Sequence, residues 1–269
     1  MRVSKGFAVA LADGIGSSDV SQVASAFAVM GLLDDYYATP DAWSVKKSVE
    51  RVLGAVNAWL HSRTQQSLFR DDIDRGYVCT LSALVFKAST AHVFHVGDAR
   101  IYRVHGEALE ALTEDHRVRV SGTQSYLGRA LGFGLRIDID HLALPVQPGD
   151  AFLLATDGVH EHVDEAFMAR AVDAGGVDLD RAARTIVDEA FRRGSPDNLT
   201  VQIVVVDAVG SGDALEGLRQ LPELALPPPV LEPRSVFDGY RIVRRLHASS
   251  RSHVYLAVDG DSQEVVALK

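Results

Sequence analysis

Short apolar runs and longer amphipathic stretches divide the chain into predictable elements. Phe7–Ala12 is an apolar run followed by Asp13-Gly14, and its length favours a buried strand over a helix. Ser17–Tyr37 and Trp43–Gln66 instead repeat apolar residues at helical spacing. The stripe of the second stretch consists of Val45, Val49, Val52, Val56, Trp59 and Leu60. The pattern therefore predicts a strand followed by two long helices.

From Val78 onward, the pattern is typical of short strands separated by Gly, Asp and Pro. The predicted strands are Val78–Phe86, Ala91–Val96, Arg100–Val104, Ile137–Leu142, Ala151–Ala155 and Leu199–Val206. Helical spacing returns at Glu165–Asp173 and Leu179–Arg193. Strands mixed with segregated helices predict an α+β fold, in which helices cover stacked sheets.

The last roughly 60 residues contain a proline-rich stretch followed by short predicted strands, and they are long enough for a linker and a small second module. Pro227-Pro228-Pro229 cannot lie inside a helix or a central strand, so residues 209–234 are predicted to be a linker. Three further strands are predicted at Asp238–Leu246, His253–Val258 and Glu264–Leu268. We therefore predict a domain over residues 1–208, a linker over 209–234 and a second piece over 235–269.

Composition narrows the class of protein. The 269 residues are 47% hydrophobic and 23% charged, with a formal net charge of −9 and no basic cluster, which disfavours nucleic-acid binding. A single cysteine, Cys79, excludes an intrachain disulfide framework and suits a reducing compartment. No stretch approaches the roughly 20 apolar residues that span a bilayer, and Met1–Val9 does not resemble a signal peptide. We expect a cytoplasmic protein with no membrane contact within this chain.

Candidate chemistry lies at the ends of the apolar runs. Asp13, Asp98 and Asp157 each follow a predicted strand, and Asp197 directly precedes one. Acids next to core strands are costly unless they are paired or bind a metal. Converging carboxylates suit Mg²⁺ or Mn²⁺, whereas any one Asp-Gly pair alone is more often a simple turn.

Five motifs together resemble the metal-dependent (PPM, type 2C) serine/threonine protein phosphatases. In chain order they are Asp13-Gly14, Val96-Gly97-Asp98-Ala99-Arg100, Leu112-Thr113-Glu114-Asp115-His116, Thr156-Asp157-Gly158 and Asp197-Asn198-Leu199-Thr200. The resemblance covers roughly residues 6–207. It implies a β-sandwich of two antiparallel sheets flanked by helix pairs, with a two-metal site at one end.

The resemblance also implies roles for single residues. Asp13 would bridge two Mn²⁺ or Mg²⁺ ions, with the Gly14 carbonyl reaching one of them, and Asp157 and Asp197 would complete the shell of the other. Asp98 would help to bind a third, weaker ion, and Asn198 would orient Asp197 rather than bind metal. Two such ions permit water to attack phosphoserine or phosphothreonine in a phosphoprotein without a protein nucleophile.

Three other residues near the motifs have two interpretations each. Thr80 lies where the family has a Gly-Thr-Thr-like strand, and we expect a packed strand with its hydroxyl bonded to the backbone. Arg129, near the flap of the family, could contact substrate phosphate or be an exposed structural arginine. His116 is expected to be structural rather than a metal ligand.

The chain departs from the family at its start. The family has an arginine and an Asn-Glu-Asp or Asn-Gln-Asp motif upstream of the Asp-Gly strand, and nothing before Phe7 matches them. Ile15-Gly16-Ser17-Ser18 also replaces a Gly-Gly-His-like segment. We expect that the opening strand and first motif are missing here, which would leave a sheet neighbour unpaired.

The C-terminal piece resembles the start of a protein-kinase N-lobe. Lys269 matches the lysine that pairs with ATP phosphates, while His247, Ser249 and Ser252 occupy the glycine positions of the phosphate loop. The resemblance implies a bacterial phosphatase–kinase fusion, with a kinase domain acting in cis. We therefore expect a Mn²⁺- or Mg²⁺-dependent phosphoprotein phosphatase; the alternative is a catalytically weakened, phosphatase-like regulatory or binding module.

Overall fold

The structure is a computed structural model of the chain. It describes residues 5–16, 19–121, 124–210, 231–237, 239–248, 253–260 and 264–268. The chain divides into two compact units, Met1–Gly212 and Asp213–Lys269, and each is described by itself. Pro227-Pro228-Pro229, Ser249, Ser252 and Lys269 lie outside the described residues.

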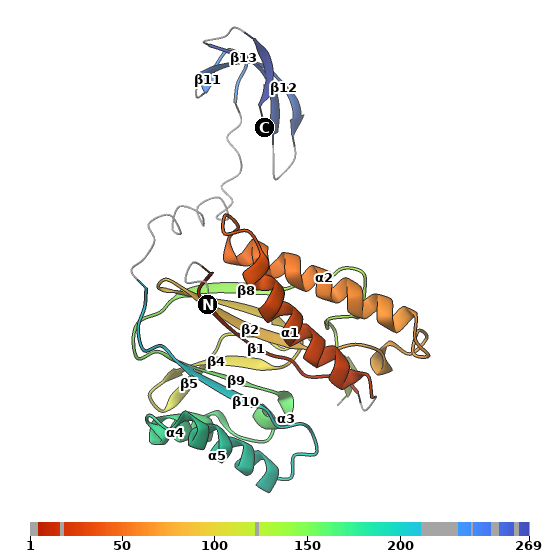
Figure 1. Cartoon of the computed structure of the whole chain (residues 1–269), viewed down its shortest axis with the longest axis vertical. Coiled ribbons are helices and arrows are strands. Elements are labelled where there is room, and N and C mark those ends of the chain that lie inside the picture. The colour runs from red at the N-terminus through yellow and green to blue at the C-terminus, as the bar shows by residue number, and fades with distance from the viewer. Residues whose placement is uncertain are drawn as a thin grey trace. The chain divides into compact units, whose positions relative to one another are not determined.

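Two antiparallel sheets face each other in the first unit (Figure 1). One has the order β1 (Phe7–Leu11), β2 (Leu81–Lys87), β3 (Thr90–Val96) and β8 (Asp140–Pro145). The other has the order β10 (Val201–Val205), β9 (Ala151–Ala155), β4 (Arg100–His105) and β5 (Ala108–Ala111). Within the described sheets, β1 and β10 have one partner each.

A pair of helices covers each sheet, which confirms the predicted α+β sandwich (Figure 1). Helices α1 (Ser21–Ala38) and α2 (Val45–Gln65) contact each other and lie over the first sheet. Helices α4 (Glu165–Gly175) and α5 (Leu179–Arg192) cover the second sheet, where α4 contacts β5 and α5 contacts β10. The result is four layers: helices, sheet, sheet and helices.

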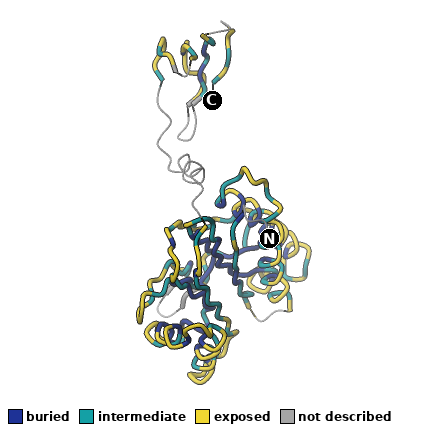
Figure 2. Tube along the Cα trace, turned by 60° about the vertical axis from the view of Figure 1, so that its left-hand side comes forward, coloured by how far each residue is buried: buried dark blue, intermediate teal, exposed yellow. Residues whose placement is uncertain are grey.

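Three hydrophobic clusters hold these layers together, and the central strands are the most buried part of the unit (Figure 2). One joins α1 and α2 to the first sheet, the next lies between the sheets, and the last joins the second sheet to α4 and α5. Strand β2 is buried on both faces, so its sequence Leu-Ser-Ala-Leu-Val is almost uniformly small or apolar rather than alternating.

Several element boundaries differ from the sequence prediction. The strand predicted at Ile137–Leu142 is wrong in position, because β8 runs from Asp140 to Pro145 and pairs with residues 90–95 of β3. Ile137 and Ile139 instead pack against the hydrophobic cluster that joins α1 and α2 to the first sheet. Apolar residues alternate with polar ones up to Ile139, and the alternation changes phase at Leu142, inside β8. Pairing with β3, not the local pattern, therefore selects the strand residues.

The prediction also missed a hairpin and a short helix. Strands β6 (Arg117–Ser121) and β7 (Gln124–Leu127) form a two-stranded sheet with a register irregularity between Arg119 and Ser121. The short helix α3 (Asp157–His160) begins at Asp157, for which the sequence predicted a metal-binding role and no helix. Both elements border the acidic residues described below.

The second unit is a four-stranded antiparallel sheet in the order β11 (Val236–Phe237), β12 (Tyr240–Ala248), β13 (His253–Asp259) and β14 (Val265–Leu268). Its small core contains Ile242, Tyr255 and Ala257. The assignment of this unit to a kinase N-lobe stays a prediction. Over the described residues, no helix has both the length and the apolar character needed to cross a membrane.

Candidate metal centre

The candidate acids gather because strands of both sheets end at the same edge of the sandwich. Asp13 follows β1, Asp98 lies in the corner between β3 and β4, Asp157 begins α3 after β9, and Asp197 precedes β10. All of them line one cavity of about 940 Å³, together with Gly14 and Asn198. Residues up to 184 positions apart in sequence thus share one solvent-filled space.

The main chain of Asp13 is held by Thr80, the residue directly before β2. Its N–H donates to Thr80 Oγ1 over 3.1 Å, and its carbonyl accepts from the Thr80 N–H over 2.8 Å. The first contact confirms the structural role expected for the Thr80 hydroxyl. Burial, followed by the charges of Asp157, Asp197 and Asp98, raises the pKa of Asp13 to about 7. The carboxylate is therefore poorly compensated by the protein itself.

Asp157 lies at the N-terminus of α3, where its Oδ1 accepts the Gly158 N–H over 2.8 Å. Burial, followed by the charges of Asp98 and Asp197, raises the pKa of Asp157 to about 6. A Cβ added at Gly158 would lie 2.6 Å from the Asn198 carbonyl oxygen. Glycine at this position thus lets the segment that carries Asp197 lie directly against the start of α3.

Asp197 and Asn198 form a small turn at the rim of the cavity. The Asn198 N–H donates to Asp197 Oδ1 over 2.7 Å, and the Asn198 carbonyl accepts from Thr156 Oγ1 over 3.0 Å. The main chain of Asn198 thus orients the Asp197 carboxylate next to the strand that leads into Asp157. The predicted orienting role of Asn198 remains a prediction for its side chain.

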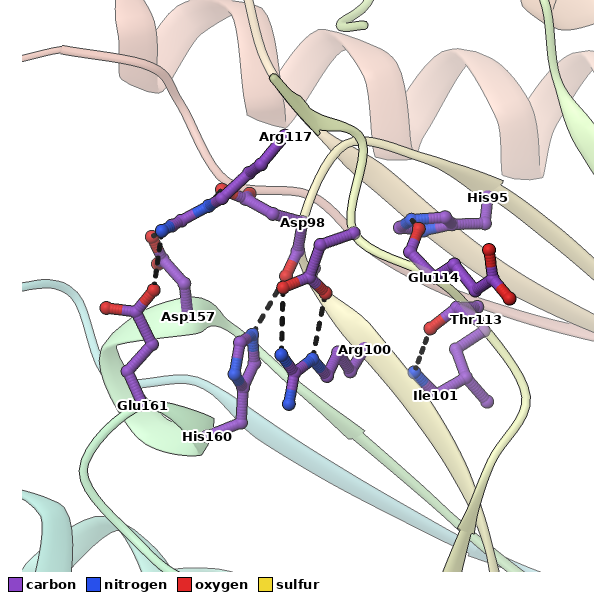
Figure 3. A network of polar contacts seen from close by, with 12 residues as sticks. His95, Asp98, Arg100, Ile101, Thr113, Glu114, Arg117, Asp157, His160 and Glu161 are labelled. Atoms are coloured by element: carbon purple, nitrogen blue, oxygen red, sulfur yellow. Dashed lines mark hydrogen bonds and ion pairs between the residues drawn. The ribbon is translucent and has the colours of Figure 1, made fainter. Parts of the chain in front are cut away.

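Two histidines hold the main chain at Asp98. The Gly97 N–H donates to His116 Nδ1 over 3.1 Å, so His116 carries its proton on Nε2 and donates to Asp140 Oδ2 over 2.9 Å. On the other side, His160 Nε2 lies 2.8 Å from the Asp98 carbonyl and donates to it (Figure 3). Asp98 is 8% exposed, so its position in the cavity wall is determined by protein contacts.

Arg117 at the start of β6 binds three acids at once (Figure 3). Its Nε lies 2.8 Å from Asp98 Oδ2, its Nη2 3.1 Å from Asp157 Oδ2 and its Nη1 2.7 Å from Glu161 Oε1. Sequence reasoning did not single out Arg117. Its only signal was its place directly after Thr113-Glu114-Asp115-His116, and nothing local shows which acids it meets.

Arg129 is placed differently from the other candidates. Its Nη1 lies 2.7 Å from Asp140 Oδ1, and Arg129 is absent from the described residues that line the acidic cavity. Through Asp140 it is connected to His116 and hence to the Gly97–Asp98 corner. Its predicted contact with substrate phosphate stays a prediction.

The acids fit a divalent cation by ligand type and by charge. Mg²⁺ and Mn²⁺ prefer carboxylate and carbonyl oxygens, and the raised pKa values of Asp13 and Asp157 mark uncompensated negative charge. Within the described ranges, however, no group of three or more His, Cys, Asp or Glu residues is already arranged to hold an ion. One oxygen each of Asp98 and Asp157 is bound to Arg117 instead.

A family model and two relatives with similar sequences are all described as protein phosphatases. The family model described as protein phosphatase 2C matches residues 2–198. "Serine/threonine phosphatase stp" of Listeria monocytogenes serotype 4b (strain F2365) is 28% identical over 224 residues, covering 76% of this chain and 86% of the relative. "Serine/threonine protein phosphatase PstP" of Mycobacterium tuberculosis (strain ATCC 25618 / H37Rv) is 27% identical over 217 residues, covering 75% of this chain and 40% of the relative.

Solved structures show the same fold. PppA, described as a key regulatory component of T6SS in Pseudomonas aeruginosa, superposes with a TM-score of 0.62 at 26% identity, covering 73% of this chain and 84% of that one. The catalytic domain of PstP in complex with two manganese ions gives a TM-score of 0.62 at 23% identity, covering 74% of this chain and 88% of that one.

Proposed function

The chain belongs to the protein phosphatase 2C family, and from this premise we propose that it hydrolyses phosphoserine and phosphothreonine in proteins with the help of Mn²⁺ or Mg²⁺. The observation that carries the proposal is the gathering of Asp13, Asp98, Asp157 and Asp197 around one cavity. A phosphatase relative binds two manganese ions on the same fold.

In this proposal, some residues bind the metal ions directly and others hold these ligands in place. Asp13, the Gly14 carbonyl, Asp157 and Asp197 hold two ions, and Asn198 keeps Asp197 in place. When bound, the ions activate water for attack and stabilise charge on the phosphoryl group. The protein supplies position: Thr80 holds Asp13, and the N-terminus of α3 holds Asp157 through the Gly158 N–H. No serine, threonine or cysteine nucleophile is needed.

Two further parts of the proposal concern the C-terminal unit and the cellular location of the enzyme. We propose that residues 235–269 are the start of a kinase N-lobe, so that a kinase acts in cis; an antiparallel sheet over Val236–Leu268 supports this. We also propose a cytoplasmic location, which the single cysteine among 269 residues supports.

The test is phosphate release from a phosphothreonine peptide in the presence of Mn²⁺. We expect Asp157→Asn to lower turnover by on the order of 100-fold or more, the size typical for loss of one electrostatic contact to the transition state. Asp188→Asn, the same chemical change at an exposed position on α5, should leave turnover within about twofold.

Chelation of the metal should abolish the activity of the unchanged chain. Turnover that survives both chelation and Asp157→Asn would overturn the proposed reaction. A chain that binds Mn²⁺ but releases no phosphate would instead be the regulatory or binding module considered as the alternative.

A further inference from the structure

Arg117 contacts two of the four aspartates of the candidate centre. Its guanidinium contacts Asp98, Asp157 and Glu161 over 2.7–3.1 Å, and each contact uses a different nitrogen. Only 29% of the Arg117 side chain is exposed, so these ion pairs are partly shielded from water. Such charge-assisted contacts are stronger than exposed surface ion pairs.

The contacts of Arg117 overlap with those that a metal ion needs. Asp157 has two carboxylate oxygens: Oδ1 accepts the Gly158 N–H, and Oδ2 accepts from Arg117. Asp98 likewise presents Oδ2 to the guanidinium. A divalent cation that takes Oδ2 of either acid must therefore share it with Arg117 or displace Arg117. A cation bound to the other oxygen of the same carboxylate still lies within several ångströms of the guanidinium, and the two positive charges repel each other.

The place of Arg117 in the fold allows such displacement. It is the first residue of β6, in a hairpin that pairs only with itself among the described strands. Asp98 lies in the corner between β3 and β4, and Asp157 lies at the start of α3. His116, which directly precedes Arg117, binds this corner through its N–H and its ring, so the backbone beside Arg117 is tied to it. The part of Arg117 that can move is therefore its long side chain, which can turn away while Asp98 and Asp157 stay in position.

We propose that Arg117 is an internal cation that competes with divalent metal ions for Asp98 and Asp157, and so sets the metal affinity of this chain. Without metal, the guanidinium neutralises part of the acidic cavity and keeps the hairpin over it. When metal binds, Arg117 gives up at least one of these oxygens. The inference rests on the proposed metal centre.

The test measures Mn²⁺ binding by titration calorimetry in the absence of substrate, on the whole chain and on Arg117→Gln. We expect Arg117→Gln to bind Mn²⁺ roughly tenfold more tightly, because tenfold corresponds to about 1.4 kcal/mol, the scale of one charge-assisted hydrogen bond. The unfolding temperature without metal should fall, and the rise caused by Mn²⁺ should become larger than in the unchanged chain.

Two variants separate competition from other effects. Arg129→Gln removes one positive charge near the same hairpin, but its partner is Asp140, so its Mn²⁺ affinity should stay within about twofold. Arg117→Lys keeps the charge and loses the planar fork, so its affinity should lie between those of the unchanged chain and Arg117→Gln. If Arg117→Gln does not fold, the comparison of Arg117→Lys with the unchanged chain still tests the proposal.

The outcomes are distinct. Unchanged or weaker Mn²⁺ binding by both Arg117 variants, beside normal binding by the unchanged chain, overturns the competition and leaves the proposed reaction standing. Equal tightening by Arg129→Gln would reduce the effect to general charge and also overturns it. Absence of Mn²⁺ binding in every chain overturns both this inference and the proposed function.

Discussion

His92 in β3 is a buried histidine with little to stabilise its charged form. It is 3% exposed, its Nδ1 lies 3.2 Å from His141 Nε2, and its Nε2 has no hydrogen-bond partner among the described residues. Burial, followed by the nearby charges of His141 and Lys87, lowers the pKa of His92 to about 4. The unfolded chain, with a pKa near the ordinary value of about 6.5, accepts a proton more readily than the folded one.

We predict that His92 makes the protein less stable in acid. Because its folded pKa is depressed, its contribution is present above about pH 6.5 and is lost as the pH falls towards 4. His92→Leu should therefore raise the free energy of unfolding at pH 5, relative to the unchanged chain, by on the order of 1–2 kcal/mol. Chemical denaturation at pH 5 and pH 7.5 measures this effect.

The control for His92 is a histidine in a different setting. His105 has a side chain that is 51% exposed and lies 2.9 Å from Glu110, so His105→Leu should not reproduce the gain at low pH. An identical pH profile for His92→Leu and the unchanged chain would contradict the argument from burial.

At the scale of elements, Asn57 connects α2 to the loop after β7. It is 1% exposed; its Oδ1 accepts the Gly132 N–H over 2.8 Å, and its Nδ2 donates to the Gly134 carbonyl over 2.8 Å. The loop continues towards β8, which completes the first sheet. One amide therefore satisfies two backbone groups of a segment with no strand or helix of its own.

We predict that Asn57→Leu, which has a similar volume, destabilises the protein by about 2 kcal/mol, since it leaves a buried backbone N–H unpaired. Thermal unfolding should show a lower midpoint. Ser62→Ala, at an exposed position on the same helix, should change it little. A midpoint equal to that of the unchanged chain would mean that the loop finds other partners at no cost.

At the scale of the whole molecule, the two units have separate cores. The three clusters of the first unit are built from residues between Ala8 and Val209, and the cluster of the second from residues between Leu231 and Leu268. Every described residue that lines the cavity of Asp13 and Asp157 also belongs to the first unit.

We predict that a chain shortened to residues 1–210 folds and keeps its Mn²⁺-dependent turnover within about threefold, because the three clusters and the four aspartates of the cavity all lie within it. Circular dichroism and phosphate release from a phosphothreonine peptide measure both properties beside the full chain. Loss of folding in the shortened chain would show that the second unit contributes to the stability of the first.

The helices and the central strands were predictable because their signals are local. The apolar stripes of α2 and α5 repeat at helical spacing, and β2, β3 and β9 are short apolar runs bounded by turn residues. The weaker predictions lie between β5 and β8, where exposed and half-buried residues give no strong period. There the position of β8 depends on β3, a partner about 50 residues earlier.

The sequence by itself determined an α+β fold of stacked sheets, which follows from periodicity, and the family, which follows from the resemblance of five short motifs to those of known phosphatases. The resemblance implied a shared metal site, but only the tertiary structure shows that Asp13, Asp98, Asp157 and Asp197 line one cavity and that Arg117 contacts two of them. The physical reason is the range of electrostatic interactions, which depends on distance in space and not on distance along the chain. A carboxylate acts on any charge within several ångströms, whatever its distance along the chain, so the partners of an acid become known only when the strands that carry them have been brought together.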